Sequence, residues 1–156
     1  MPYDPGMSRW IALIALALTA CATETRYEEA PGQDDAELMQ AATDAWSTVG
    51  VATPADYAIV FLGLEQLQAE CEDASPGIVG CAVPTAGAVL LLAGEAPEVQ
   101  AQALIHEVGH LIKGTRHLDH GRLPHLDCGQ GDVMCAYGAP VGTFPTVRDA
   151  AFVRAR

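Results

Sequence analysis

The chain has 156 residues, and half of them are hydrophobic. This length and composition suit one folded domain and exclude intrinsic disorder for most of the chain. The 20 acidic side chains outnumber the 8 basic ones, which gives a formal net charge of −12. Because a phosphate backbone repels that charge, we expect no nucleic-acid partner. Composition therefore leaves a small, acidic, globular domain.

The first 20 residues have the pattern of an export signal. Arg9 precedes an apolar run over residues 10–18, and small residues lead from there to Cys21. The run is shorter than the roughly 20 residues that a helix needs to cross a bilayer, which disfavours a transmembrane anchor. We therefore predict a signal peptide over residues 1–20.

The Leu-Thr-Ala-Cys sequence that ends at Cys21 resembles the lipobox of bacterial lipoproteins. The resemblance implies that Cys21 is lipidated and anchors the protein to a membrane of the bacterial cell envelope. An ordinary signal peptide with a chance cysteine is the alternative. Residues 21–33 are polar and aperiodic, so we expect a flexible tether there, followed by the folded domain over residues 34–156.

Patterning predicts one helix and two strands in the first part of this domain. Asp34 and Glu37 are spaced like a capping box, apolar residues then recur at helical intervals, and Gly50 ends the pattern. Residues 57–62 and 88–93 are β-rich runs. The segment between them carries cysteine, proline and glycine, and we expect it to be a loop.

The second part of the domain is predicted to hold two more helices. Pro97 suits the first turn of a helix and Gly114 its left-handed end, which predicts a helix over residues 97–113. Residues 115–145 look irregular, and Thr146 with Asp149 can cap a last helix that ends near residue 154. The order of these elements indicates an α+β fold.

Four cysteines beyond Cys21 indicate disulfides in an exported chain. We expect pairing between neighbours, because each neighbouring pair brackets a loop rich in glycine, proline or aspartate. Zinc binding by the cysteines is the alternative, but no CxxC spacing supports it. The predicted pairs are Cys71–Cys81 and Cys128–Cys135.

The chemistry concentrates at the HExxH sequence formed by His106, Glu107 and His110. Residues four apart lie on one face of a helix, so both imidazoles can reach one zinc ion at about 2.0–2.1 Å. Glu107 is then placed to take a proton from a metal-activated water. The alternative is a helix with two exposed histidines, because so short a motif also arises by chance.

A catalytic zinc site takes a third protein ligand and leaves its fourth position open. Glu107 is the last glutamate of the chain, which excludes a glutamate from a later helix as that ligand. The third ligand must therefore be a later histidine or aspartate. The candidates are His117, Asp119, His120, His125 and the later aspartates.

This region resembles the metzincin metallopeptidases, whose pattern is HExxHxxGxxH followed by a methionine turn. Gly114 and His117 keep the GxxH spacing, although three residues instead of two separate His110 from Gly114. The resemblance implies that His117 is the third zinc ligand. Asp119, which the small snapalysin-like enzymes of that kind use, and His120 are the alternatives.

Residues 132–137 are similar to the methionine turn of the same family. The resemblance implies that Met134 lies beneath the metal ligands, and ordinary core packing is the alternative. In several metzincins a tyrosine two residues after the methionine supports the transition state. Tyr137, three residues after Met134, is the counterpart here.

The resemblance implies a small, snapalysin-sized metzincin-like domain and a zinc-dependent endopeptidase. Peptide or protein substrates would be hydrolysed by a metal-activated water with Glu107 as the general base, and strand 88–93 would offer its free edge to an extended peptide. We expect a monomer. The alternatives are a non-catalytic zinc-binding lipoprotein with a degenerate fold of this kind and, third, an adhesion or assembly module of the cell surface.

Overall fold

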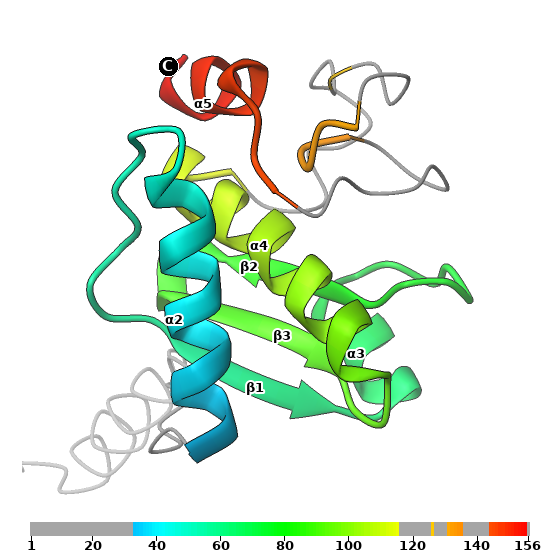
Figure 1. Cartoon of the computed structure of the whole chain (residues 1–156). Coiled ribbons are helices and arrows are strands. Elements are labelled where there is room, and N and C mark those ends of the chain that lie inside the picture. The colour runs from blue at the N-terminus through cyan, green and yellow to red at the C-terminus, as the bar shows by residue number, and fades with distance from the viewer. Residues whose placement is uncertain (1–32, 116–125, 127–130, 136–143, 156) are drawn as a thin grey trace, which may run out of the picture.

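The structure, a computed structural model, describes residues 33–115, 126, 131–135 and 144–155. Helices and a three-stranded mixed sheet form an α+β domain, as the sequence predicted (Figure 1). The predicted signal peptide, Cys21 and nearly all of the tether lie outside the described residues. In chain order the elements are α2 (Gln33–Ser47), β1 (Ala58–Leu62), α3 (Leu64–Glu70), β2 (Gly80–Val83), the 3-10 turn η1 (Pro84–Ala86), β3 (Ala88–Leu92), α4 (Pro97–Lys113) and α5 (Val147–Arg154).

The three predicted helices are confirmed, with small shifts at their ends. Helix α2 begins one residue before Asp34, and Gly50 takes the left-handed conformation just after the helix, with φ of +69°. Helix α4 has the predicted bounds. At α5, the Thr146 side chain accepts from the backbone of Arg148 and Asp149, and the Asp149 side chain accepts from the Thr146 backbone. This is the predicted capping box.

The two predicted strands are neighbours in the sheet, but they are joined by a strand that the sequence did not predict. The strand order is β1-β3-β2, with β1 parallel and β2 antiparallel to β3. Strand β3 pairs on both sides, for example Val89 with Ile59 of β1 and with Ala82 of β2. The prediction that strand 88–93 offers a free edge is therefore wrong. Among the described strands, β1 and β2 lie at the two edges of the sheet.

The segment between the two predicted strands is also more regular than a loop. It contains α3, β2 and η1, and Cys71 at the end of α3 forms a disulfide with Cys81 in β2. These three elements are short, so none of them shows a helical or alternating period that patterning could detect. Tertiary packing and the cross-link stabilise them instead.

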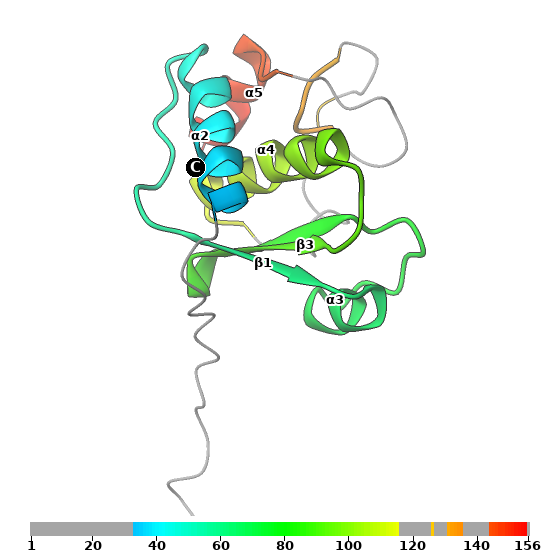
Figure 2. The ribbon, with the colours of Figure 1, turned by 60° about the horizontal axis from the view of Figure 1, so that its bottom comes forward.

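Both faces of the sheet are covered. Figure 2 shows α2, α4 and α5 on one side of the sheet and α3 on the other. Because alternate strand residues point to opposite faces, Val89 and Leu91 join the core beneath α2 and α4, while Leu90 joins a smaller core with Leu67 of α3. The strands are therefore apolar on both faces, and α4 lies fixed against the sheet.

No helix within the described part of the chain is long and apolar enough to cross a membrane. The export and lipid-anchor predictions concern residues that lie outside that part.

Candidate metal centre

Helix α4 carries the candidate site in its last two turns. Pro97 occupies the first turn, where its missing N–H costs no helical hydrogen bond, and Glu98 lies beside it near the positive end of the helix dipole. The helix ends at Gly114, whose φ of +73° favours glycine and whose N–H donates to the His110 and Leu111 carbonyls. The HExxH residues therefore lie on a regular helix with a defined end.

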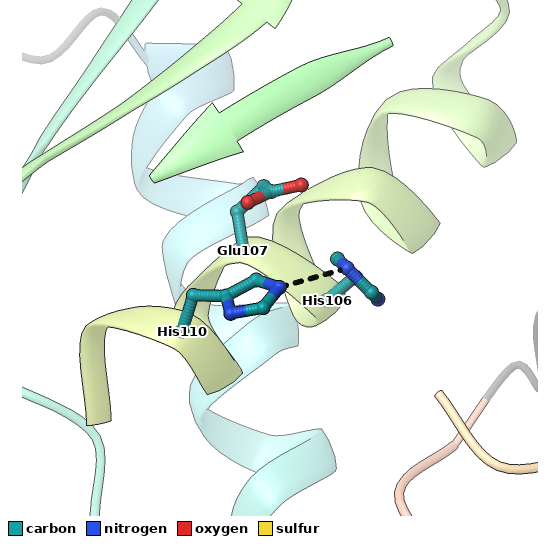
Figure 3. Close-up of side chains that lie close together, drawn as sticks. All are labelled: His106, Glu107 and His110. Carbon is teal, nitrogen blue, oxygen red and sulfur yellow. Dashed lines mark hydrogen bonds between the residues drawn. The ribbon is translucent and has the colours of Figure 1, made fainter. Parts of the chain in front are cut away.

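The imidazoles of His106 and His110 lie one helical turn apart and face each other. Their Nε2 atoms are 3.1 Å apart, and the ring planes meet at 69°. Figure 3 shows the rings turned toward each other, while Glu107 reaches from the same helix toward the sheet. His110 is buried and His106 is partly buried. The alternative of a helix with two exposed histidines is therefore excluded.

The orientation of the His106 ring is fixed from outside the helix. Its Nδ1 lies 2.6 Å from the carbonyl oxygen of Val133, which can only accept a hydrogen bond. The proton of the neutral ring is therefore on Nδ1, and Nε2 carries the lone pair that a metal ion needs. A carbonyl on the distal nitrogen is the common way in which proteins orient a metal-binding histidine.

The His110 ring has a different partner. Its Nδ1 lies 3.2 Å from the hydroxyl oxygen of Thr115, the residue that follows Gly114. A hydroxyl can donate or accept, so this contact is compatible with either neutral tautomer of His110. When Thr115 accepts, the Nε2 atoms of both histidines present lone pairs.

The separation of these two nitrogens fits a shared metal ion. Two nitrogens at about 2.0–2.1 Å from a tetrahedral zinc ion would lie roughly 3.3–3.4 Å apart. The observed 3.1 Å is within a few tenths of an ångström of that spacing. Imidazole nitrogen also suits copper, iron and nickel, so the geometry identifies a metal-binding pair without selecting the element.

Glu107 lies on the sheet side of the same helix and is 2% exposed. One of its carboxylate oxygens lies within 4.8 Å of the ligand nitrogens of both histidines. Burial raises the pKa of Glu107 from 4.5 to about 8, and a hydrogen bond from the Ala82 backbone N–H opposes that rise. Edge strand β2 therefore positions the carboxyl that the sequence assigned as the base.

Met134 packs against α4 at Gly109. The methionine is fully buried, and a side chain on Gly109 would overlap both its sulfur and the Trp46 ring. The Trp46 indole donates to the Ile105 carbonyl at 2.9 Å, which fixes the ring on the helix. Only glycine between the two histidines lets the methionine and the tryptophan approach so closely.

The remaining predicted site residues fall into two groups. Cys71 and Cys81 form the predicted disulfide, and Cys135 is also disulfide-bonded, although its predicted partner Cys128 is not among the described residues. Most third-ligand candidates and Tyr137 are not among the described residues either, so His117, Asp119, His120, His125 and Tyr137 remain predictions. The later aspartates that the structure describes, Asp132 and Asp149, are bound to the 132–134 turn and α5 and do not join the histidines.

Three contributions to the site were missed by the sequence reasoning. Val133 and Ala82 act through backbone atoms, which leave no trace in residue identity. Asp149 was predicted only as a capping residue, yet its carboxylate also accepts from the amides of Val133 and Met134. The one sequence signal for this contact was a capping aspartate, Asp149, that follows the Asp-Val-Met turn.

Comparisons with protein-family models, with curated proteins and with solved structures found no match for this chain. The case for a function therefore depends on the geometry of the site.

Proposed function

We propose that the protein is a zinc-dependent endopeptidase of the metzincin type. The observation that carries this proposal is the pair of Nε2 atoms that face each other at 3.1 Å, with a buried glutamate beside them. The HExxH order is typical of peptidases because it places two ligands and one base on a single helix. A binding site alone would have no use for the glutamate.

In this proposal His106 and His110 hold the metal, together with one of the later candidates, of which His117 is the first. When bound, zinc would supply Lewis-acid activation of water and of the peptide carbonyl. Glu107 accepts a proton from the attacking water and then donates it to the departing amine. The apolar surroundings of Glu107 keep bulk water from competing for that proton.

The raised pKa of Glu107 sets a condition on this role. With a pKa of about 8, the carboxyl keeps its proton at neutral pH and cannot act as a base. A cation held by the neighbouring histidines favours the carboxylate, because opposite charges a few ångströms apart lower an acid's pKa. Glu107 therefore becomes a base only when the metal is present.

An extended substrate would pair with the outer edge of β2, and not with β3, which lies in the interior of the sheet. Within the described residues, β2 pairs only with β3, and its Ala82 N–H reaches Glu107. A peptide added to this edge would pass beside the base and the histidines. The correction from β3 to β2 thus brings the proposed substrate path to the site.

The proposal is tested by metal content and peptide hydrolysis in two glutamate variants. Glu107→Gln should keep about one zinc per chain and lose nearly all hydrolysis, because it removes the base and leaves the ligands. Glu98→Gln is the matched control, since Glu98 is exposed on the same helix, and it should behave like the wild type. Equal hydrolysis by Glu107→Gln and wild type would refute the mechanism.

The second candidate is a non-catalytic zinc-binding protein. The observation that favours it is the same raised pKa, which a purely structural buried carboxyl would also show. A wild-type protein that binds zinc but hydrolyses neither casein nor a peptide library would support this candidate over the peptidase.

A further inference from the structure

Two fully buried aspartates lie next to the candidate metal centre without belonging to it. Asp132 is 1% exposed and Asp149 is not exposed at all. Aspartate is rarely buried to this extent unless hydrogen bonds or an ion pair compensate for the lost water. Their partners therefore indicate what these side chains do.

Asp149 has more partners than a helix cap requires. Its capping role needs one bond, from the Thr146 N–H to Oδ2 at 2.7 Å. The carboxylate also accepts from the Val133 N–H at 3.1 Å and from the Met134 N–H at 2.9 Å. These two bonds contribute nothing to α5, and they fasten two consecutive amides of the 132–134 turn.

Asp132 fastens the start of the same turn. Its Oδ1 accepts from the Thr146 hydroxyl at 2.6 Å, and its Oδ2 lies 2.8 Å from Nη1 of Arg148. The turn is therefore attached to the first turn of α5 at three consecutive residues. A turn held at three residues can keep a backbone carbonyl oxygen in one fixed direction.

The carbonyl that these bonds hold in place is that of Val133. The Val133 amide donates to Asp149, and the Val133 carbonyl accepts from Nδ1 of His106 at 2.6 Å. A continuous path of hydrogen bonds therefore leads from the Asp149 carboxylate through one peptide residue to the His106 ring. The path joins residues 43 positions apart in the sequence.

We propose that Asp149 is a positioning residue for His106: by fixing the 132–134 turn, it holds the His106 ring in one orientation and in the tautomer with the proton on Nδ1. The inference deepens the proposed function, on which its metal-binding consequence rests. Without the Asp149 bonds, the Val133 carbonyl would no longer have a fixed direction. His106 would then exchange between tautomers, and only one of them presents Nε2 to a metal.

The test compares Asp149→Asn with Lys113→Met in the full chain. Asp149→Asn keeps the side-chain shape but replaces one acceptor oxygen with a donor that faces backbone N–H groups. Lys113 donates to the Phe152 and Ala155 carbonyls at the opposite end of α5, at 2.9 and 2.8 Å. Its substitution therefore weakens the attachment of α5 without touching the turn.

The primary readout is the tautomer of His106 in the metal-free protein, measured from imidazole nitrogen shifts by NMR at about pH 8, where a histidine of ordinary pKa is neutral. Wild type and Lys113→Met should show one tautomer, protonated on Nδ1, and Asp149→Asn should show a mixture. Zinc affinity from chelator competition should fall roughly 10- to 100-fold in Asp149→Asn only. A folded Asp149→Asn with the wild-type tautomer would overturn the inference.

A measurement on the wild type alone covers the case in which Asp149→Asn fails to fold. The Val133 and Met134 amides should exchange with deuterium as slowly as those of α4, and exchange at the rate of an exposed loop would overturn the inference. Failure of the proposed function gives a different result. A wild type that shows the Nδ1 tautomer and slow exchange, yet binds no zinc or cleaves no peptide, would support the positioning role and refute the peptidase.

Discussion

The two sides of α4 are held by different kinds of structure. On the sheet side, Glu107 receives its backbone hydrogen bond from edge strand β2, which a disulfide ties to the end of α3. On the other side, His106 depends on the Val133 carbonyl of an irregular turn that a buried carboxylate holds in place. The proposed base thus depends on the sheet, whereas the proposed metal ligand depends on the turn. Changes on the sheet side should therefore leave metal binding by the histidines largely intact.

The largest effect is expected on the sheet side, in the pH dependence of stability. Because burial raises the pKa of Glu107 to about 8, the folded metal-free protein keeps a proton that the unfolded chain releases above about pH 4.5. The free energy of unfolding should therefore fall as pH rises from about 5 to 8, on the order of several kcal/mol in all. Glu107→Gln should lack this part of the fall in the free energy of unfolding. Urea unfolding at several pH values, with a chelator present, measures the change.

The comparison of those two unfolding profiles isolates Glu107 from the many other acids. Glu98→Gln, which alters an exposed carboxyl of the same helix, should follow the wild-type profile. Parallel profiles for wild type and Glu107→Gln would show that the carboxyl is not held in a low-dielectric site.

On the turn side, removal of a ligand should lower the zinc affinity much more than the stability of the fold. His106→Ala should lower zinc affinity by more than roughly 100-fold, because loss of a direct ligand exceeds the usual loss from an orienting residue. Thr115→Val removes only a partner of His110 and should cost less. Chelator competition measures both, and equal losses would contradict the assignment of His106 as a direct ligand.

Removal of the disulfide should separate the two sides. The double substitution Cys71→Ala with Cys81→Ala should lower the free energy of unfolding by about 2–4 kcal/mol, which is typical for a cross-link of this kind. Because β2 positions Glu107 and not the histidines, hydrolysis should fall while zinc affinity stays near the wild-type value. Loss of zinc in a folded double variant would show that the two sides are coupled.

The smallest expected effect concerns Trp46, which packs against α4 at Gly109. Trp46→Phe keeps most of the buried ring and removes the indole hydrogen bond to Ile105, which should cost about 0.5–1.5 kcal/mol. Thermal unfolding measures this change. Zinc affinity should stay near the wild-type value, because phenylalanine keeps an aromatic ring packed against Gly109 and the substitution leaves both histidines in place.

Local signals predicted α2, α4 and α5 well, and for a physical reason. The bounds of α4 follow from Pro97 at its start and Gly114 at its end, and the α5 cap follows from Thr146 and Asp149. These interactions span a few residues, so they can be seen in the sequence. The pairing of His106 with His110 across one helical turn is local in the same sense.

The parts that were missed depend on contacts between distant segments. Strand β2 has four residues, one of them Gly80, and it exists because β3 and the disulfide hold it. The prediction that strand 88–93 lies at the edge was wrong for the same reason. No local sequence signal indicated that β2 pairs with β3 on the side opposite β1. The Val133 and Ala82 backbone contacts also depend on the fold and not on side-chain identity.

The path from Asp149 to His106 has a further consequence for the order of events in folding. A helix such as α4 can form within about a microsecond, and that alone brings His106 and His110 onto one face. The Val133 carbonyl arrives only after the chain closes a loop from residue 106 to residue 133 and α5 docks. Both histidines therefore lie on one face of the helix before the His106 ring is oriented. We expect stopped-flow absorbance measurements of refolding in the presence of cobalt(II) to show the metal's absorption bands appearing with the slow docking phase, and not with helix formation.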